Sequence, residues 1–120
     1  MDENRLRGLL GLSVRARTAT FGMDGCLKSI RGGTCRLLLV DAAASQATLD
    51  KYLDACRSHG TEIRIVPEDL IEEATGHSGV AVALAQGGLT EQIMALQGLK
   101  RPGELKENQE ENLCGGADFE

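Results

Sequence analysis

The sequence contains four cysteines and two histidines, and their spacing decides whether they could bind a metal. The cysteines stand at positions 26, 35, 56 and 114, and no two of them form the Cys-x-x-Cys pair typical of zinc sites. Cys56 and His59 are three positions apart, but no second ligand pair accompanies them. Since apolar stripes surround the first three cysteines, we expect these to be small buried hydrophobes and expect no metal or cofactor.

Catalytic motifs are missing as well. The sequence has no Gly-x-Ser-x-Gly elbow, no phosphate-binding P-loop and no Gly-x-Gly-x-x-Gly after a strand. Glu72 and Glu73 are neighbours on an expected helix, where successive side chains point about 100° apart, so they cannot converge as an acid and base pair. We therefore expect a protein that is not an enzyme.

A glycine-bounded segment in the first third could contact an anionic partner. Residues 18–21 are typical of a short strand, and Gly22, Met23, Asp24 and Gly25 then open a helix that carries Lys28 one turn on. A helix N-terminus with glycine beside it suits phosphates or base edges in an opened groove. Further positive charge would come from Arg15, Arg17, Arg31 and Arg36. Alternatively, the glycines only mark where the helix begins and ends.

Gly76-His77-Ser78-Gly79 is a second candidate loop, with His77 as a side chain that hydrogen-bonds a ligand. The alternative is a flexible connection between a helix and a strand. Seven basic and three acidic residues among the first 36 favour an anionic partner, although solvated faces also produce such asymmetry. Three aromatic residues in the whole chain are too few for a platform on which bases stack.

Helix and strand patterns alternate along the chain and must position these segments. Apolar periodicity and capping residues predict helices over residues 3–15, from Met23 to 32–33, from an N-cap at Ser45 to Gly60, from Pro67 to Gly76, and from Thr90 to 96. Strands are expected at 18–21, 35–40, 63–66 and 80–85. This order indicates a largely parallel or mixed sheet between helices.

The composition changes near residue 100. We expect one domain over residues 1–100 and a mobile acidic tail over 101–120, which holds two basic and six acidic residues. Cys114 in this tail is expected to be the reactive thiol. The apolar runs 37–40 and 80–85 are too short to span a membrane, and the first residues do not resemble a secretory signal. A cytoplasmic location is expected.

Several segments together resemble a known family. They are residues 8–12 with Arg15 and Arg17, residues 22–33, residues 36–43, Cys56, and residues 74–76. In their order and glycine spacing they are similar to the bacterial YlxQ-type branch of the ribosomal L-seven-Ae/L-thirty-e superfamily of kink-turn RNA-binding proteins. The resemblance covers about residues 4–97.

The resemblance implies a three-layer α/β/α sandwich with a four-stranded mixed sheet, and a structured RNA, not DNA, as the partner. In the family the second helix begins Gly-x-Asn-Glu-x-x-Lys and reads guanine edges, and the loop before the last strand packs on bulged nucleotides. Gly22 and Lys28 match, whereas Asp24 and Gly25 replace the Asn and the Glu. Base reading is therefore expected to be weaker. The alternatives are a protein-interaction module, which the acidic net charge favours, and an accessory domain for an RNA-modifying enzyme.

Overall fold

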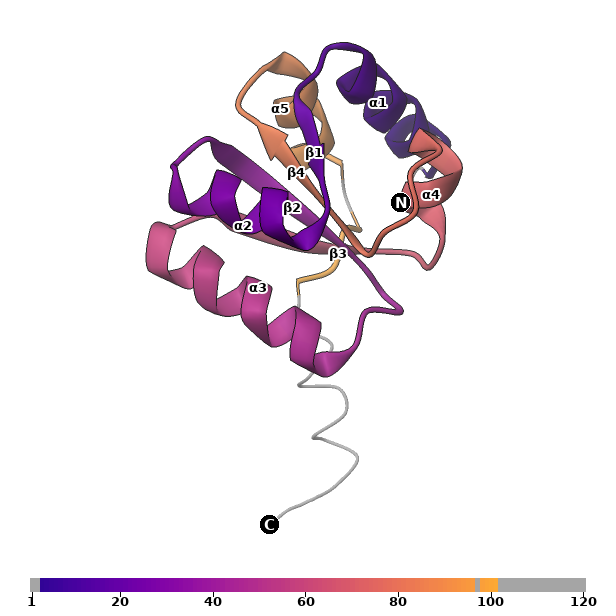
Figure 1. Cartoon of the computed structure of the whole chain (residues 1–120). Helices are drawn as coiled ribbons and strands as arrows, with labels where there is room; N and C mark the ends of the chain where they lie inside the picture. Colours follow the sequence, from indigo (N-terminus) through magenta and orange to yellow (C-terminus); the bar gives the residue numbers. More distant parts are fainter. Residues whose placement is uncertain (1–2, 97, 102–120) are drawn as a thin grey trace.

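The computed structural model describes residues 3–96 and 98–101, in which five helices and four strands alternate (Figure 1). The elements are α1 (Glu3–Arg15), β1 (Ala19–Phe21), α2 (Met23–Arg31), β2 (Cys35–Asp41), α3 (Gln46–His59), β3 (Glu62–Val66), α4 (Leu70–Thr75), β4 (Ala81–Ala85) and α5 (Gly88–Met94). Their number and order confirm the prediction from apolar periodicity. The expected tail, including Cys114, lies almost entirely outside the described residues.

The four strands form one mixed sheet in the order β1-β4-β2-β3. Strand β4 is antiparallel to both of its neighbours, whereas β2 and β3 are parallel. Strands β1, β2 and β3 therefore run in one direction, and they finish at Phe21, Asp41 and Val66. We call this end, where β4 begins, the carboxyl end of the sheet. The loops that precede α2, α3 and α4, and the loop between α4 and β4, all lie there.

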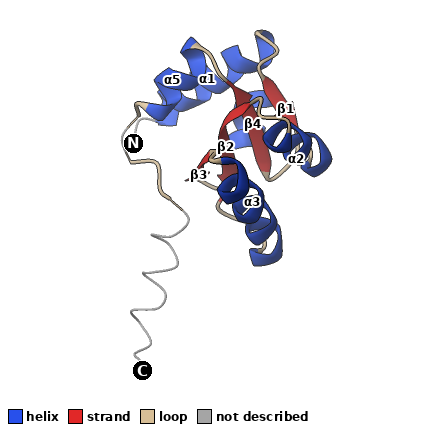
Figure 2. Cartoon of the chain, turned by 90° about the vertical axis from the view of Figure 1, so that its left-hand side faces the viewer, coloured by secondary structure: helices blue, strands red, loops and turns tan. Residues whose placement is uncertain are grey.

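Helices cover both faces of the sheet. Leu37 and Leu39 of β2 belong to a core with α1, α4 and α5, whereas Leu38 and Val40 belong to a core with α2 and α3. This alternation follows from the pleat of a strand, which sends successive side chains to opposite faces. Figure 2 shows the sheet between α1 and α5 on one side and α2 and α3 on the other. The three-layer α/β/α arrangement is thus confirmed.

Helix α3 has the boundaries that its sequence predicts. The Ser45 hydroxyl accepts a hydrogen bond from the backbone N–H of Thr48 at 3.2 Å, as an N-cap does. Gly60 ends the helix with a φ of 68°, in the left-handed region that favours glycine. Both signals are local, so the sequence alone is sufficient to place them.

Two other helix starts were predicted wrongly. Helix α4 begins at Leu70 rather than Pro67, because Asp69 takes a φ of 67° and its N–H donates to Asp41 Oδ2 at 3.0 Å. Helix α5 begins at Gly88 rather than Thr90, whose buried hydroxyl donates to the carbonyl of Ala85 at 2.6 Å. In both cases the deciding partner belongs to a preceding strand.

Within residues 3–96 and 98–101, the structure has no helix that is both long and apolar enough to span a membrane.

Candidate nucleic-acid interface

Helix α2 starts directly after β1, at the carboxyl end of the sheet. Gly22 occupies the N-cap position with a φ of 84°, which is strained for any residue with a side chain. No side chain caps the helix. The first backbone N–H groups of α2 therefore have no capping side chain over them, as an anion-binding helix terminus requires.

Gly25 allows α2 to lie close to β1. A Cβ atom built on Gly25 would come within 2.9 Å of the Thr20 Cγ2 methyl on β1. The Cys26 thiol, one residue further, donates to the Thr20 carbonyl at 3.4 Å. A larger residue at position 25 would thus require Thr20 to change its rotamer, whereas Asp24 is exposed and Met23 is half-buried.

The two loops proposed from the sequence lie next to each other. The Phe21 ring at the end of β1 stacks on the His77 ring, with centroids 4.2 Å apart and planes 13° from parallel. His77 is further held by its N–H, which donates to Thr75 Oγ1 at 3.2 Å. Since Phe21 precedes Gly22, this contact places the exposed residues 76–79 beside the start of α2. The role of Phe21 was not predicted from the sequence, because no local pattern pairs it with His77.

The expected ring of positive charge around Gly22 is only partly assembled. Lys28 is exposed on α2, one turn beyond Gly25. Arg15 and Arg17 precede β1, and the carbonyl of Thr18 accepts a hydrogen bond from the N–H of Ala85 at the end of β4. Both arginines therefore lie at the opposite end of the sheet from Gly22. Figure 1 shows the connection from α1 to β1 at that end. Arg31 is the last residue of α2, so its backbone lies at the other end of that helix from Gly22.

Arg36 also lies outside this cluster. Its guanidinium Nε is 3.3 Å from Glu91 Oε2 of α5, which belongs to the other layer of helices. Lys28 is therefore the predicted cation that lies nearest to the first turn of α2.

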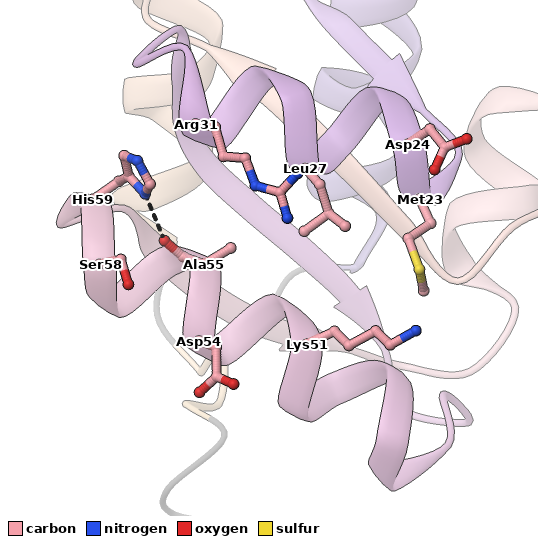
Figure 3. A pocket seen from close by; sticks show the side chains of 9 residues that line it. All are labelled: Met23, Asp24, Leu27, Arg31, Lys51, Asp54, Ala55, Ser58 and His59. Atoms are coloured by element: carbon pink, nitrogen blue, oxygen red, sulfur yellow. Dashed lines mark hydrogen bonds between the residues drawn. The ribbon is translucent and has the colours of Figure 1, made fainter.

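A groove of about 640 Å³ runs between α2 and α3 (Figure 3). Its lining comes from one face of each helix: Met23, Asp24, Leu27, Arg31, Lys51, Asp54, Ala55, Ser58 and His59. His59 Nδ1 lies 3.1 Å from the Ala55 carbonyl, so this histidine sits at the end of α3, as expected. The groove was not predicted from the sequence, although Lys51, Asp54 and Ser58 have the spacing of one helix face.

The first three cysteines are buried, as the apolar stripes predict. Cys26, Cys35 and Cys56 pack with Tyr52 between the sheet and α2 and α3, and all three are free thiols. Burial raises the pKa of Cys26 and Cys35 to about 11 and that of Cys56 to about 12. Such thiols are poor nucleophiles at neutral pH.

The remaining candidate ligands are dispersed. Among the described residues, no three His, Cys, Asp or Glu side chains gather as a metal site would require. Glu73 forms an exposed ion pair with Arg7 of α1 at 3.0 Å.

No protein-family model and no curated protein sequence matches the chain, whereas solved structures do. A Bacillus halodurans protein of unknown function has 27% identity and a TM-score of 0.70, and the match covers 74% of this chain and 92% of that one. A Giardia lamblia 15.5kD RNA binding protein has 15% identity and a TM-score of 0.64, with 77% of this chain and 80% of that one covered. This chain shares the fold of an RNA-binding protein.

The same fold also occurs within a larger protein. An archaeal translation termination factor matches with 18% identity and a TM-score of 0.50 over 65% of this chain. The match spans only 23% of that factor, so this chain corresponds to one part of it.

Proposed function

We propose that this chain is a non-catalytic RNA-binding protein of the ribosomal L-seven-Ae/L-thirty-e type, in its YlxQ-type branch, and that it contacts structured, kink-turn-like RNA. The observation that carries the proposal is the fold shared with the Giardia RNA-binding protein over 80% of that protein's length. The Phe21–His77 stack supports it, because it holds both predicted contact segments on one surface.

In this proposal the start of α2 binds the RNA mainly through its backbone. The uncapped N–H groups after Gly22 donate to phosphates, and Lys28 adds a positive charge one turn on. Ionised Asp24 cannot donate to guanine O6 or N7, and Gly25 has no side chain to accept from a base. Each missing base contact weakens discrimination by about 1–3 kcal/mol.

Gel-shift titrations with a kink-turn RNA, a kink-turn with mutated G·A pairs and a plain duplex test the proposal. We expect the kink-turn to bind most tightly of the three RNAs. Its advantage in affinity over the other two should be smaller than two intact base contacts would give. Equal affinity for the three RNAs would refute recognition of the bend, and no shift with any of them would refute RNA binding.

Lys28→Ala tests the cation on α2. We expect weaker binding to all three RNAs. The affinity should also depend less steeply on salt concentration, by about one released counterion, because a lysine that contacts a phosphate releases about one counterion. Arg57→Ala is the matched control, because Arg57 is exposed on α3 and does not line the α2–α3 groove. If both variants lose affinity equally, Lys28 has no specific role.

A protein-interaction module remains a second candidate, favoured by the net charge of −5 and by Asp24 at the start of α2. Affinity capture with and without ribonuclease separates the two functions. Partners that survive ribonuclease support the second candidate, and partners lost on digestion support RNA binding or an accessory role beside an RNA-modifying enzyme.

A further inference from the structure

The end of the sheet opposite the start of α2 carries a group of arginines. We call it the amino end, because β1 and β2 begin there and β4 ends between them. The N–H of Ala85 donates to the Thr18 carbonyl at 2.9 Å, and Ala85 also pairs with Cys35. These contacts bring together three segments of the chain: residues 15–18, 31–36 and 85–91 (Figure 1). The three segments contain four arginines, no lysine and one acidic residue, Glu91.

Three of the four arginines are exposed and have no acidic partner. Within the residues that the structure describes, Arg15, Arg17 and Arg31 form no ion pair. Arg36 differs, because its Nε lies 3.3 Å from Glu91 Oε2. The one carboxylate of the three segments is therefore already paired, and the charges of the other three arginines are open to an anion from outside.

The two ends of the sheet carry opposite charge. At the carboxyl end, residues 22–25, 41–46 and 66–80 contain six acidic residues and no lysine or arginine. At the amino end, the nearest further carboxylate is that of Glu62 at the start of β3, and it pairs with Arg64 at 2.7 Å. A polyanion is thus attracted to the amino end and repelled by most of the carboxyl end, although the whole chain has a net charge of −5.

The backbone of Arg17 has a conformation that glycine adopts more readily. Helices α1 and α2 end in the same motif, in which the N–H groups of Thr18 and Thr34 each donate to the carbonyl five residues earlier, at 3.0 Å. The residue before the donor is Gly33 in α2, with a φ of 78°, but Arg17 in α1, with a φ of 61°. A side chain in this left-handed region is strained. Helix α1 therefore ends on an exposed arginine at a position where glycine would be more stable.

We propose that the amino end of the sheet is a second RNA-contacting surface, on which Arg15, Arg17 and Arg31 bind backbone phosphates. Because it takes RNA as the partner, this surface rests on the proposed function. A guanidinium group presents a planar fork of N–H donors that fits two phosphate oxygens at once. Contacts of this kind orient an RNA and carry no information about its bases.

Helix α2 separates this surface from the site proposed above. Its nine residues span about 13 Å, since each helical residue advances about 1.5 Å. Lys28 lies between the two ends and lines a surface hollow together with Asp24 and Arg31. An RNA that meets both surfaces passes along this side of α2, so the amino end holds a segment of the RNA beside the one that the start of α2 contacts.

Plain duplex RNA is the probe for this surface, because it lacks the bend proposed to fit the start of α2. Changing Arg15, Arg17 and Arg31 to Gln should weaken duplex binding several-fold at about 50 mM salt. The slope of log affinity against log salt concentration should become less steep by about 2–3, because about one counterion is released for each phosphate contact. Fluorescence anisotropy with labelled duplex measures both quantities.

A matched control removes three cations that lie away from the amino end: Arg7, Lys51 and Lys100, each changed to Gln. This control variant has the same net charge as the arginine variant, and it should lose much less affinity for the duplex. Equal losses in the two variants would overturn the proposal, because net charge alone would then explain them. Absence of any duplex binding by the unmodified chain would overturn it as well.

The preference for a kink-turn over a kink-turn with mutated G·A pairs distinguishes this surface from the proposed function. The arginine variant should bind both RNAs more weakly and keep the ratio of their affinities, since that ratio depends on the start of α2. A kink-turn preference together with a duplex affinity that the arginine variant retains would overturn the second surface alone. Duplex affinity that depends on the arginines, without any kink-turn preference, would support the second surface and refute recognition of the bend.

Arg17→Gly separates binding from stability. This change should raise the melting temperature by about 2–4 °C, because it relieves the strained backbone, and should weaken duplex binding. Arg17→Lys keeps the charge and the strain, so it should retain most of the affinity and the original melting temperature. Duplex affinity that Arg17→Gly leaves unchanged would overturn the role of Arg17.

Sedimentation of the chain without RNA tests whether a second copy occupies the arginines instead. The acidic carboxyl end of one copy is the alternative partner for the amino end of another. A chain that sediments as a monomer at about 50 mM salt, where charges are little screened, supports the proposal. Association that the arginine variant abolishes would assign the surface to a second copy and overturn the proposal.

Discussion

Three thiols and one phenol meet in the buried layer under α2 and α3, and none of them is expected to ionise at neutral pH. Burial is the largest cause of the raised pKa at each of Cys26, Cys35 and Cys56, and it raises the pKa of Tyr52 to about 12. The neutral forms are therefore part of what stabilises the folded state.

We predict that the free energy of unfolding falls as the pH rises from about 9 toward 12. Below the pKa of the unfolded thiols, near 9.0, the stabilisation is fully present, and it is lost as the pH approaches the folded values of about 11 to 12. A shift of two units corresponds to roughly 2–3 kcal/mol for one thiol. Urea unfolding at a series of pH values measures the slope.

Cys56→Ala provides the control for this prediction. The variant should be less stable at pH 7, because it leaves a small cavity, but its stability should fall less steeply above pH 9. An identical slope in the two proteins would show that Cys56 does not contribute to the alkaline loss.

Thr20, Asp24 and Gly25 together determine how α2 meets RNA in the proposed function. We predict that Asp24→Asn with Gly25→Glu tightens kink-turn binding, and that it does so more strongly when Thr20→Ser is added. The reason is the Thr20 Cγ2 atom, 2.9 Å from a Cβ at position 25, which serine lacks. Each restored base contact should contribute about 1–3 kcal/mol.

Gel shifts of the double variant, the triple variant and Thr20→Ser alone measure this effect. Thr20→Ser alone should leave RNA affinity unchanged. If the triple variant binds the kink-turn no better than the unmodified chain, positions 24 and 25 do not face the RNA.

At the scale of the elements, the Phe21–His77 stack joins the β1–α2 junction to the α4–β4 loop. We predict that Phe21→Leu and His77→Ala are non-additive, with a coupling of about 0.5–1.5 kcal/mol, as for other aromatic pairs. Leucine retains the apolar bulk of Phe21 and removes the ring face. A double-mutant cycle of unfolding free energies gives the coupling.

Hydrogen exchange of the amides at 77–80 provides a local readout of the same contact. Exchange should be faster in Phe21→Leu, because the loop loses its attachment to β1. A coupling close to zero together with unchanged exchange would mean that the stack does not hold the loop.

The helices also show why some of their start and end residues can be predicted from the sequence and others cannot. Ser45 and Gly60 act on their own helix, so α3 is placed correctly from local signals. The conformation of Asp69 depends on a carboxylate at the end of β2, and Thr90 bonds to a strand carbonyl. Contacts of this kind, like the Phe21–His77 stack, exist only once the sheet is assembled, and no periodicity predicts them.

For the whole molecule, the alternation of elements is sufficient to predict the layers but not the distribution of charge. The sequence suggests that the arginines before β1 surround Gly22. In the structure they lie at the far end of the sheet, because β1 carries the chain away from them before α2 begins. The cations beside α2 are therefore Lys28, Arg31 and Lys51, and two of these line the α2–α3 groove together with Asp24 and Asp54.

The acidic residues near the end of the chain and an RNA carry the same sign of charge, so we expect these residues to oppose RNA binding. We predict that removing residues 102–120 raises RNA affinity several-fold at about 50 mM salt and much less at about 500 mM, where charges are screened within about 4–5 Å. The removed residues include six acidic and one basic side chain, so the remaining chain repels phosphates less strongly. Fluorescence anisotropy with labelled RNA at both salt concentrations measures the change.

A chain with Glu104, Glu107, Glu110 and Glu111 changed to Gln provides the control, because it keeps the length of the tail and loses four of its six acidic side chains. At the lower salt concentration this chain should gain most of the affinity that the shortened chain gains, since repulsion of phosphates depends on charge and not on the length of the tail. Unchanged affinity in both chains at about 50 mM salt would show that the acidic residues do not oppose RNA binding.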